Sequence, residues 1–362
     1  MNSRERVLKT VNRETPDRPP IFATLTPQAA KKLSDYHNLP YEEPLDSMLS
    51  TRISHSDLLT QLGNDCVGIA GCAPNNFPTK ELDDGILLNE WGMKFVDQGI
   101  YYEFYEYPLA HATSVDDIKN YNFPDSFAEG RFDEAQKAID KYGKTHAIVA
   151  DLETAFFETA WYLVGLEKLL MDMALGEEYV DTLFDKVMEV NVPVGKKLIE
   201  MGADILWAGD DFGSQKQMLI APEMWRHYFK PRIREMIQEF KSVNPDIKVA
   251  WHSCGSIIPI IPDLIEIGLD ILNPIQPLAA QMEPNFLKDN FGSELVFFGG
   301  IDIQYLLPHG TPGQIKAEIK RRNDILGKNG GYIIAPAHNI QDDTSVENIM
   351  AFFKAAKNYP ND

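Results

Sequence analysis

The chain has 362 residues, of which 44% are hydrophobic and 24% charged, so it has ordinary globular composition and enough length to bury a large core. Its formal net charge of −20 at pH 7 argues against nucleic acid as a partner, because phosphate binding requires a basic surface. No apolar run reaches the roughly 18 residues that a membrane-spanning helix needs. We therefore expect neither a nucleic-acid partner nor a membrane span.

The cellular compartment is indicated by the N-terminus and the cysteines. The first residues are polar and lack the apolar stretch of a secretory signal. The three cysteines, Cys66, Cys72 and Cys254, are too few for a disulfide framework, and their odd number suits a reducing compartment. We expect a cytoplasmic protein.

Eight short apolar runs recur along the chain. They are continuous rather than alternating, which is typical of parallel strands buried on both faces. The runs cover residues 18–24, 64–70, 146–152, 204–211, 248–255, 270–276, 295–302 and 331–338.

Amphipathic segments with helical periodicity separate most of these runs. Pro222 occupies a position typical of the first turn of a helix, and Gly202 and Gly268 follow predicted helix ends. The alternation predicts a single α/β domain over residues 1–362, folded as a (β/α)8 TIM barrel. A doubly wound open sheet is the alternative, but no GxGxxG follows the first run. The helical segments are residues 128–142, 154–173, 177–201, 222–241, 257–267, 312–326 and 345–356.

Residues 73–108 interrupt the alternation. Residues 87–94 and 100–107 are expected to be antiparallel strands around residues 97–99. We interpret this region as a β-hairpin insertion after the second strand, which covers the barrel mouth or makes a subunit contact. Its aromatic residues either line a substrate-facing surface or pack within the hairpin, which is the commoner role; they are Trp91, Tyr101, Tyr102, Phe104, Tyr105 and Tyr107.

Polar residues stand at the downstream ends of the apolar runs. Catalytic groups of TIM barrels lie at the C-terminal ends of the strands, so these residues are candidates for the active site. The candidate catalytic carboxylates are Glu153, Asp210, Asp211 and Asp302. The candidates for substrate binding are Asn273, Gln276, Gln304 and Asn339, together with Trp91.

Asp210 and Asp211 are neighbours at the end of one run. Adjacent carboxylates raise one another's pKa, which suits an acid/base pair. Successive side chains of a strand point to opposite faces, so at most one of the two faces the barrel interior. The other interpretation is that one of them caps a helix or holds a loop.

His252 and Cys254 form an HxC pair whose side chains point the same way along a strand. An imidazole beside a thiolate is a partial zinc site, and His338, three strands onward, is the candidate third ligand. A fourth position would be filled by water, a substrate thiol or ether, or Glu153. From spacing alone, a metal-free polar site, core packing, and a Cys254 nucleophile with His252 as base all stay open.

The order and spacing of several sequence blocks resemble the uroporphyrinogen decarboxylase superfamily, on its cobalamin-dependent methyltransferase branch. The resemblance covers nearly the whole chain and implies a TIM barrel. The blocks are PDRPP (16–20), NEWG (89–92), GDDFGSQ (209–215), APEMWRHYFKP (221–231), WHSCGSI (251–257), GLDILNPIQ (268–276), GGID (299–302) and GGYIIAPAHNIQ (330–341).

The resemblance distinguishes two activities. Uroporphyrinogen decarboxylases use no cofactor and bind their acidic substrate through an arginine-rich loop after the first strand, whereas residues 22–33 here contain no arginine. The methyltransferase branch moves methyl groups between a corrinoid protein and a thiol or a methylated small molecule. Members that resemble methylcobalamin:coenzyme M methyltransferase hold zinc with an HxC…C motif. His252 and Cys254 match its first two ligands, and His338 stands where those enzymes carry cysteine.

The resemblance therefore implies a methyltransferase activated by zinc, with the cobalamin carried by a partner corrinoid protein. Dimers are common in the superfamily, so a homodimer is expected. A metal-free decarboxylase that acts on a different carboxylated substrate is the second hypothesis. A non-enzymatic subunit that docks a corrinoid protein is the third.

Overall fold

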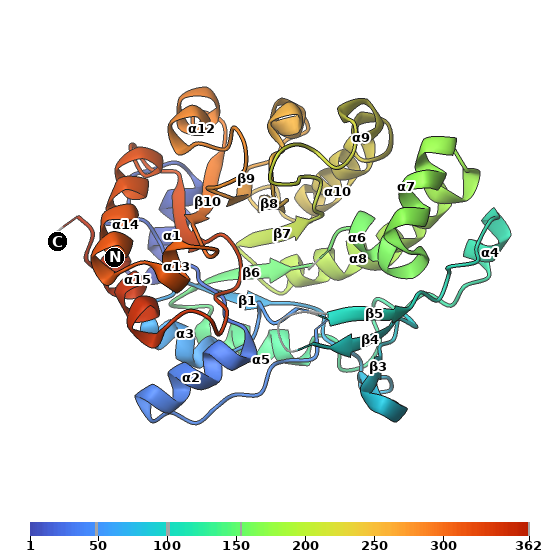
Figure 1. Ribbon diagram of the computed structural model, residues 1–362, viewed down its shortest axis with the longest axis horizontal. Helices are drawn as coiled ribbons and strands as arrows, with labels where there is room; N and C mark the ends of the chain where they lie inside the picture. The colour runs from blue at the N-terminus through green and yellow to red at the C-terminus, as the bar shows by residue number, and fades with distance from the viewer. Residues whose placement is uncertain (48–49, 99–101, 153, 361–362) are drawn as a thin grey trace.

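The computed structural model describes residues 1–47, 50–98, 102–152 and 154–360. Within them, seven parallel strands form a curled sheet, a half-barrel with helices on its outer side (Figure 1). The strands are adjacent in the order in which they follow along the chain. They are β1 (Cys66–Ile69), β6 (Ala147–Asp151), β7 (Ile205–Gly209), β8 (Lys248–His252), β9 (Ile271–Ile275), β10 (Val296–Ile301) and β11 (Tyr332–Pro336).

The helices follow the predicted segments closely. Residues 154–173 divide into two helices at Gly165, whose φ of 92° interrupts helical geometry, and residues 222–241 divide at Phe229. The helices are α1 (Ser3–Val11), α2 (Pro27–His37), α3 (Ser56–Leu62), α4 (Val115–Lys119), α5 (Asp133–Tyr142), α6 (Phe157–Val164), α7 (Leu166–Leu175), α8 (Glu178–Glu200), α9 (Pro222–Tyr228), α10 (Lys230–Val243), α11 (Ile261–Glu266), α12 (Pro284–Phe291), α13 (Leu306–His309), α14 (Pro312–Leu326) and α15 (Val346–Asn358). Among the described residues no helix is both long and apolar enough to cross a bilayer.

The predicted first strand, residues 18–24, does not form a ladder. It makes isolated parallel bridges to the last strand region, at Ile21–Ile334 and Leu25–Ile340. On the other side, the Asp65 N–H donates to the Ile21 carbonyl at 2.8 Å. Pro19 and Pro20 have no N–H to donate, which limits regular pairing here. The predicted α/β fold with a parallel sheet is confirmed. The described residues form a curled sheet of seven strands, a half-barrel, to which residues 18–24 add isolated bridges.

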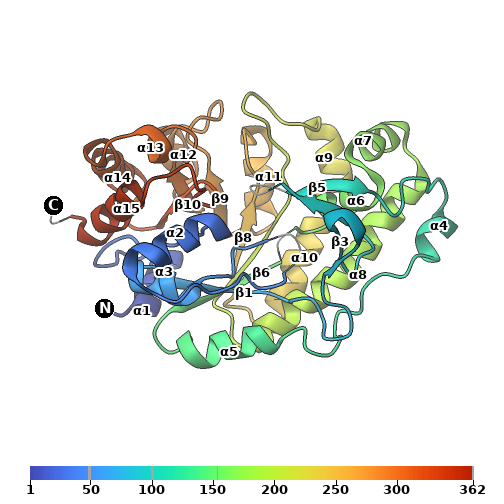
Figure 2. The same ribbon diagram turned by 60° about the horizontal axis from the view of Figure 1, so that its bottom comes forward.

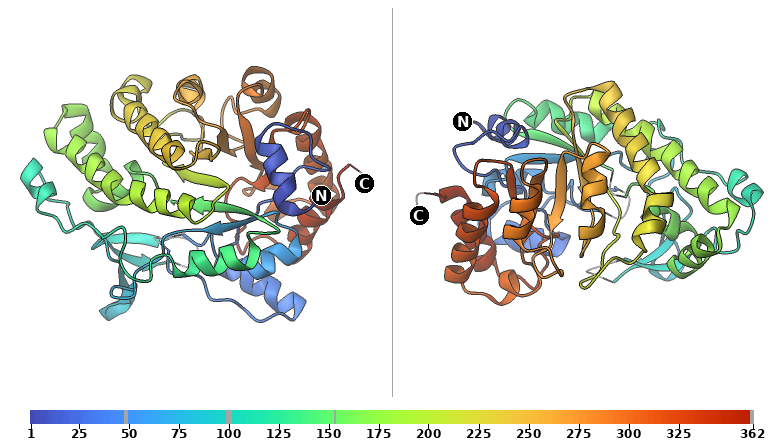
Figure 3. Two further views of the ribbon diagram at one scale, coloured as in Figure 1. Left: turned by 180° about the vertical axis from the view of Figure 1, so that it is seen from behind. Right: turned by 90° about the horizontal axis from the view of Figure 1, so that it is seen from above.

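The inner face of the sheet forms its own hydrophobic cluster. Alternate residues of each strand point inward, and Val7 and Val11 of α1 pack against the same cluster. Helix α1 contacts β1, β6 and β11, and Figure 3 shows it beside the sheet while the longer helices surround the outside. The inward strand residues are Cys66, Ala147, Val149, Ile205, Trp207, Ala250, Ile271, Val296, Phe298, Ile333 and Ala335.

A second, antiparallel sheet lies between β1 and β6 in the sequence and stands apart from the parallel sheet (Figure 2). Its strands are β2 (Lys80–Glu81), β3 (Ile86–Leu88), β4 (Lys94–Asp97) and β5 (Tyr102–Glu106), paired in that order. The predicted strand 87–94 is interrupted by a turn, in which the Asn89 side chain accepts the Trp91 and Met93 N–H groups at 3.1 Å. The region is thus a four-stranded sheet where a simple hairpin was predicted.

Candidate active site

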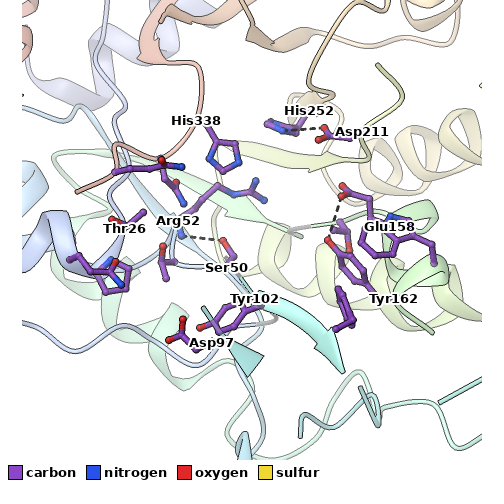
Figure 4. Close-up of a pocket in the computed structure, with 18 residues that line it drawn as sticks. Thr26, Ser50, Arg52, Asp97, Tyr102, Glu158, Tyr162, Asp211, His252 and His338 are labelled. Carbon is purple, nitrogen blue, oxygen red and sulfur yellow. Dashed lines mark hydrogen bonds and ion pairs between the residues drawn. The ribbon is translucent and has the colours of Figure 1, made fainter. Parts of the chain in front are cut away.

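A cavity of about 380 Å³ opens beside the C-terminal ends of the parallel strands. Asp211 after β7, His252 at the end of β8 and His338 after β11 line it. Strands β4 and β5 and helix α6 form another side of its wall through Tyr102, Glu158 and their neighbours (Figure 4). The start of α2, residues 50–52 and residues 339 and 341 complete the wall together with Thr154. The cavity therefore lies where the strand ends predict a site.

His252 is held in one orientation by Asn273. The His252 Nδ1 lies 2.6 Å from the Asn273 Oδ1, and the Asn273 amide donates to the Phe298 carbonyl at 3.1 Å. Since an amide oxygen only accepts, Nδ1 carries the proton and Nε2 is left with its lone pair. Burial lowers the pKa of His252 from its usual value, although the nearby Asp211 charge acts in the opposite direction. His252 is therefore neutral, and the lone pair of its Nε2 is available as a ligand in the cavity.

The Nε2 of His252 meets a thiol and a carboxylate. It lies 3.5 Å from the Cys254 Sγ and 3.5 Å from the Asp211 Oδ1. The three candidate ligand atoms lie within 4.8 Å of one another. Nitrogen, sulfur and oxygen donors at this spacing suit Zn²⁺.

The Cys254 side chain is a thiol rather than a thiolate when no cation is beside it. Burial raises the pKa of Cys254 well above its usual value, and the charges of Asp211 and Glu158 raise it further. A thiolate at this position therefore requires a positive charge beside it. The same facts disfavour a Cys254 nucleophile activated by His252 alone. The donor set thus fits a zinc ion.

His338 faces the same cavity but lies outside this group of three. Its ring centroid is 6.4 Å from that of His252. The ring is open to the cavity. The protein that surrounds it lowers its pKa to about 4, and the charges of His252 and Arg52 lower the pKa further. The described structure therefore brings Asp211, and not the predicted His338, within reach of His252 and Cys254.

The two adjacent aspartates face opposite ways, as strand geometry predicts. Asp211 continues the inward positions of Trp207 and lines the cavity. Asp210 is fully buried and accepts the N–H groups of Phe156 and Glu158 at 3.2 and 2.9 Å. Burial raises the pKa of Asp210 to about 7. Asp210 therefore lies outside the described cavity wall and its carboxylate holds the start of α6, so its catalytic role stays a prediction.

Three other candidates do not line the described cavity, and two of them hold the backbone. Asp302 accepts the N–H groups of Gln304, Tyr305 and Leu306 at 2.8 to 3.0 Å. The Gln276 Oε1 accepts the Gly255 N–H at 2.6 Å. Gln304 is exposed and is not part of the described cavity wall. Their catalytic and substrate-binding roles stay predictions.

The remaining candidates divide between the cavity and other places. Asn339 lines the cavity, and the Thr24 hydroxyl donates to its Oδ1 at 2.5 Å. Asn273 acts on His252 as described. Trp91 is buried and lines a second, smaller cavity near Arg131, and its substrate contact stays a prediction. Glu153 lies outside the described residues.

Arg52 is a cavity residue that the sequence did not reveal. Its guanidinium binds both oxygens of Asp151 at 2.7 and 2.9 Å and lies 4.5 Å from the Trp207 ring. Asp151 ends β6 and is only 3% exposed, so its charge requires a partner. The position of Asp151 at a strand end indicates that a buried acid there needs a cationic partner. The sequence does not indicate that Arg52 is that partner.

The family model for uroporphyrinogen decarboxylase (URO-D) matches residues 98–359. The chain belongs to the URO-D family. Within it, a methylated-thiol–coenzyme M methyltransferase of Methanosarcina mazei is 26% identical over 256 residues, which cover 68% of this chain and 64% of that protein. The methylcobamide:CoM methyltransferase MtbA of Methanosarcina acetivorans is 25% identical over 238 residues, 65% of this chain and 66% of that protein.

A solved structure also supports the URO-D family fold. A methyltransferase from Methanosarcina mazei aligns over 99% of both chains with a TM-score of 0.70 and 20% identity. This likeness shows the fold. The chain spans just under two thirds of the length of the two curated relatives named above.

Proposed function

We propose that this protein is a corrinoid-dependent methyltransferase. It would move a methyl group between a methylated small molecule or thiol and a cobalamin carried by a partner corrinoid protein. The curated relatives are methyltransferases, two of them named for a methylcobamide. The observation that carries the proposal is the group of Asp211, His252 and Cys254 at the cavity.

We infer that these three residues hold zinc. Bound there, zinc would act as a Lewis acid that lowers the pKa of a thiol or polarises the oxygen of a methyl ether. His338 faces the same cavity and is the alternative third ligand. Asn273 keeps the Nε2 lone pair of His252 directed to the site, a role typical of residues behind metal ligands.

The fold supplies the surroundings of this chemistry. We infer that residues 20–26 take the place of the first strand of a (β/α)8 barrel, because they bridge β11 and receive a hydrogen bond from Asp65 next to β1. The antiparallel sheet contributes Asp97, Tyr102 and Phe104 to the cavity wall. It would form part of the rim on which a corrinoid protein docks. A homodimer stays a prediction.

A metal-free decarboxylase is less well supported. An acidic substrate would meet the carboxylates of Asp97, Glu158 and Asp211. The described cavity wall offers one guanidinium against them, and Arg52 already binds Asp151 on both oxygens. A polycarboxylate would therefore enter against like charge.

Methylcobalamin tests the proposal directly. We expect zinc-loaded protein to demethylate methylcobalamin with a panel of thiols, seen as loss of its absorbance, and Cys254→Ser to abolish the reaction. Cys72→Ala is the matched control, because Cys72 is buried away from the cavity. Two assays would together contradict the proposal if both failed. The first is methyl transfer from methylcobalamin to thiols, and the second is methyl transfer from methyl ethers or methylated amines to a corrinoid protein.

A further inference from the structure

One side of the cavity is an aromatic surface. Phe104 of β5 stacks on Tyr162 of α6 with ring centroids 4.7 Å apart, and it meets the edge of Trp161 at 5.4 Å. Tyr102 precedes Phe104 by two residues on β5, so both side chains point to the same face of the strand. All four rings line the cavity and none is fully buried. Phe104 also stacks on Tyr107, with ring centroids 5.6 Å apart. The four rings thus form one aromatic side of the cavity.

The same side carries negative charge. Asp97 pairs with Tyr102 across β4 and β5, and Glu158 accepts the Tyr162 hydroxyl at 3.4 Å (Figure 4). Among the described residues of the cavity wall, Arg52 is the one lysine or arginine, and Asp151 compensates its charge. The aromatic side is therefore acidic even when Asp211 is assigned to the metal.

We propose that Tyr102, Phe104, Trp161, Tyr162, Asp97 and Glu158 bind the organic ammonium group of the small-molecule substrate. This inference rests on the proposed methyl transfer and names its substrate class. Aromatic faces attract alkylammonium ions through their negative quadrupole, and the two carboxylates add a Coulombic attraction. An anionic head group would meet like charge at the same place. The cavity thus has a metal end and an ammonium end.

A second inorganic cation does not explain this surface. Among the described residues, the group of Asp211, His252 and Cys254 is the one set of three or more ligands close enough to hold an ion. Asp97 pairs with Tyr102, and Glu158 accepts the Tyr162 hydroxyl, so each carboxylate has a ring beside it. Rings favour a large, weakly hydrated cation over a metal ion. A quaternary or tertiary ammonium group has that character.

Calorimetric titration of the zinc-loaded full chain tests the inference. The probes are choline and its neutral isostere, in which a tert-butyl group replaces the trimethylammonium group. We expect choline to bind about tenfold more tightly than the isostere, which is the difference that a cation–π contact and a nearby carboxylate supply. Equal affinities, or tighter binding of the corresponding tert-butyl carboxylate, would overturn the inference.

Two variants locate the binding surface. Trp161→Leu removes one ring, and Glu158→Gln removes a charge without changing shape, so we expect each to weaken choline binding several-fold. Glu158→Gln should leave the neutral isostere unaffected. Tyr105→Ala is the matched control, because Tyr105 lies on β5 beside Phe104 but is 63% exposed and does not line the cavity. Unchanged choline affinity in both cavity variants would count against the inference.

The ammonium site and the proposed methyl transfer can be tested independently of one another. Zinc content and methylcobalamin demethylation with thiols report on methyl transfer and need no ammonium compound. If transfer occurs while choline and its isostere bind equally, the ammonium site is wrong and the methyltransferase stands. If choline binds selectively but no transfer occurs, the ammonium site stands and the proposed reaction is wrong.

Discussion

The Oδ1 of Asn273 lies 2.6 Å from the Nδ1 of His252, and the amide of the same asparagine is tied to the Phe298 carbonyl. This arrangement connects two neighbouring strands, β8 and β9, at their C-terminal ends. It assigns the proton of His252 to Nδ1 and directs the Nε2 lone pair to Cys254 and Asp211. Asn273 therefore fixes the orientation of the His252 ring in the candidate metal site.

Replacing Asn273 tests this orientation. We expect Asn273→Ala to lower zinc affinity by about 10- to 100-fold, because partners behind a metal-binding histidine fix its ring and tautomer. Competition with a chromophoric chelator measures the effect. Asn290→Ala serves as the control, since Asn290 is an exposed residue that bonds the Phe286 carbonyl on α12. Identical zinc affinity in the wild type and Asn273→Ala would show that the hydrogen bond does not act on the metal site.

The third ligand is decided by comparing Asp211 with His338. We expect Asp211→Ala to lose most of its zinc affinity and His338→Ala to retain zinc, because Asp211 alone of the two belongs to the close group. Metal analysis of the purified variants gives the answer. The reverse result would restore the ligand set inferred from the sequence, with His338 in third place.

Arg52 should matter for stability as well as for the cavity. Arg52→Ala leaves the carboxylate of Asp151, which is 3% exposed, without its guanidinium. Breaking a buried pair in this way costs about 3–5 kcal/mol of unfolding free energy. Urea denaturation measures it. Lys137→Ala breaks a pair whose partners are 70% and 38% exposed and should cost less than about 1 kcal/mol. Equal losses in the two variants would refute the account of Arg52.

His55 provides a pH dependence that can be measured. Its side chain is 3% exposed, its buried Nε2 has no hydrogen-bond partner, and burial lowers its pKa to about 4. The folded state therefore binds fewer protons than the unfolded state between about pH 4 and pH 6.5. The contribution of His55 is fully present above pH 6.5 and is lost as pH falls through this window, by up to about 3 kcal/mol.

His55→Asn should remove that part of the pH dependence. Asparagine tolerates the left-handed backbone at this position, where φ is 61°. Urea denaturation at a series of pH values between 4 and 7 compares the variant with the wild type. A variant whose stability falls as steeply with pH as the wild type would show that His55 is not responsible.

The strand alternation predicted much of the fold and of the site. Continuous apolar runs located all seven strands of the parallel sheet, and the rule that alternate residues point inward placed His252 and Asp211 at the cavity. It also predicted that Asp210 and Asp211 face opposite ways. These features depend on a local period that is visible in the sequence.

Other features depend on where the chain turns or on distant partners. Asp302 follows the end of β10, and its carboxylate accepts three N–H groups of the next turn, which strand alternation does not predict. His338 lies beyond the end of β11 at Pro336, where alternation no longer applies. Arg52 reaches Asp151 from 99 residues away in the sequence, and no local period links the two. The antiparallel sheet depends on the turn at Asn89, whose hydrogen bonds sequence patterns do not reveal.

Zinc content, measured on protein purified without chelators, tests the central claim most directly. The account predicts a stoichiometry near one zinc per chain for the wild type and near zero for Cys254→Ser, with Cys72→Ala unchanged. A wild-type stoichiometry near zero that does not rise on incubation with zinc, or full zinc retention in Cys254→Ser, would contradict it.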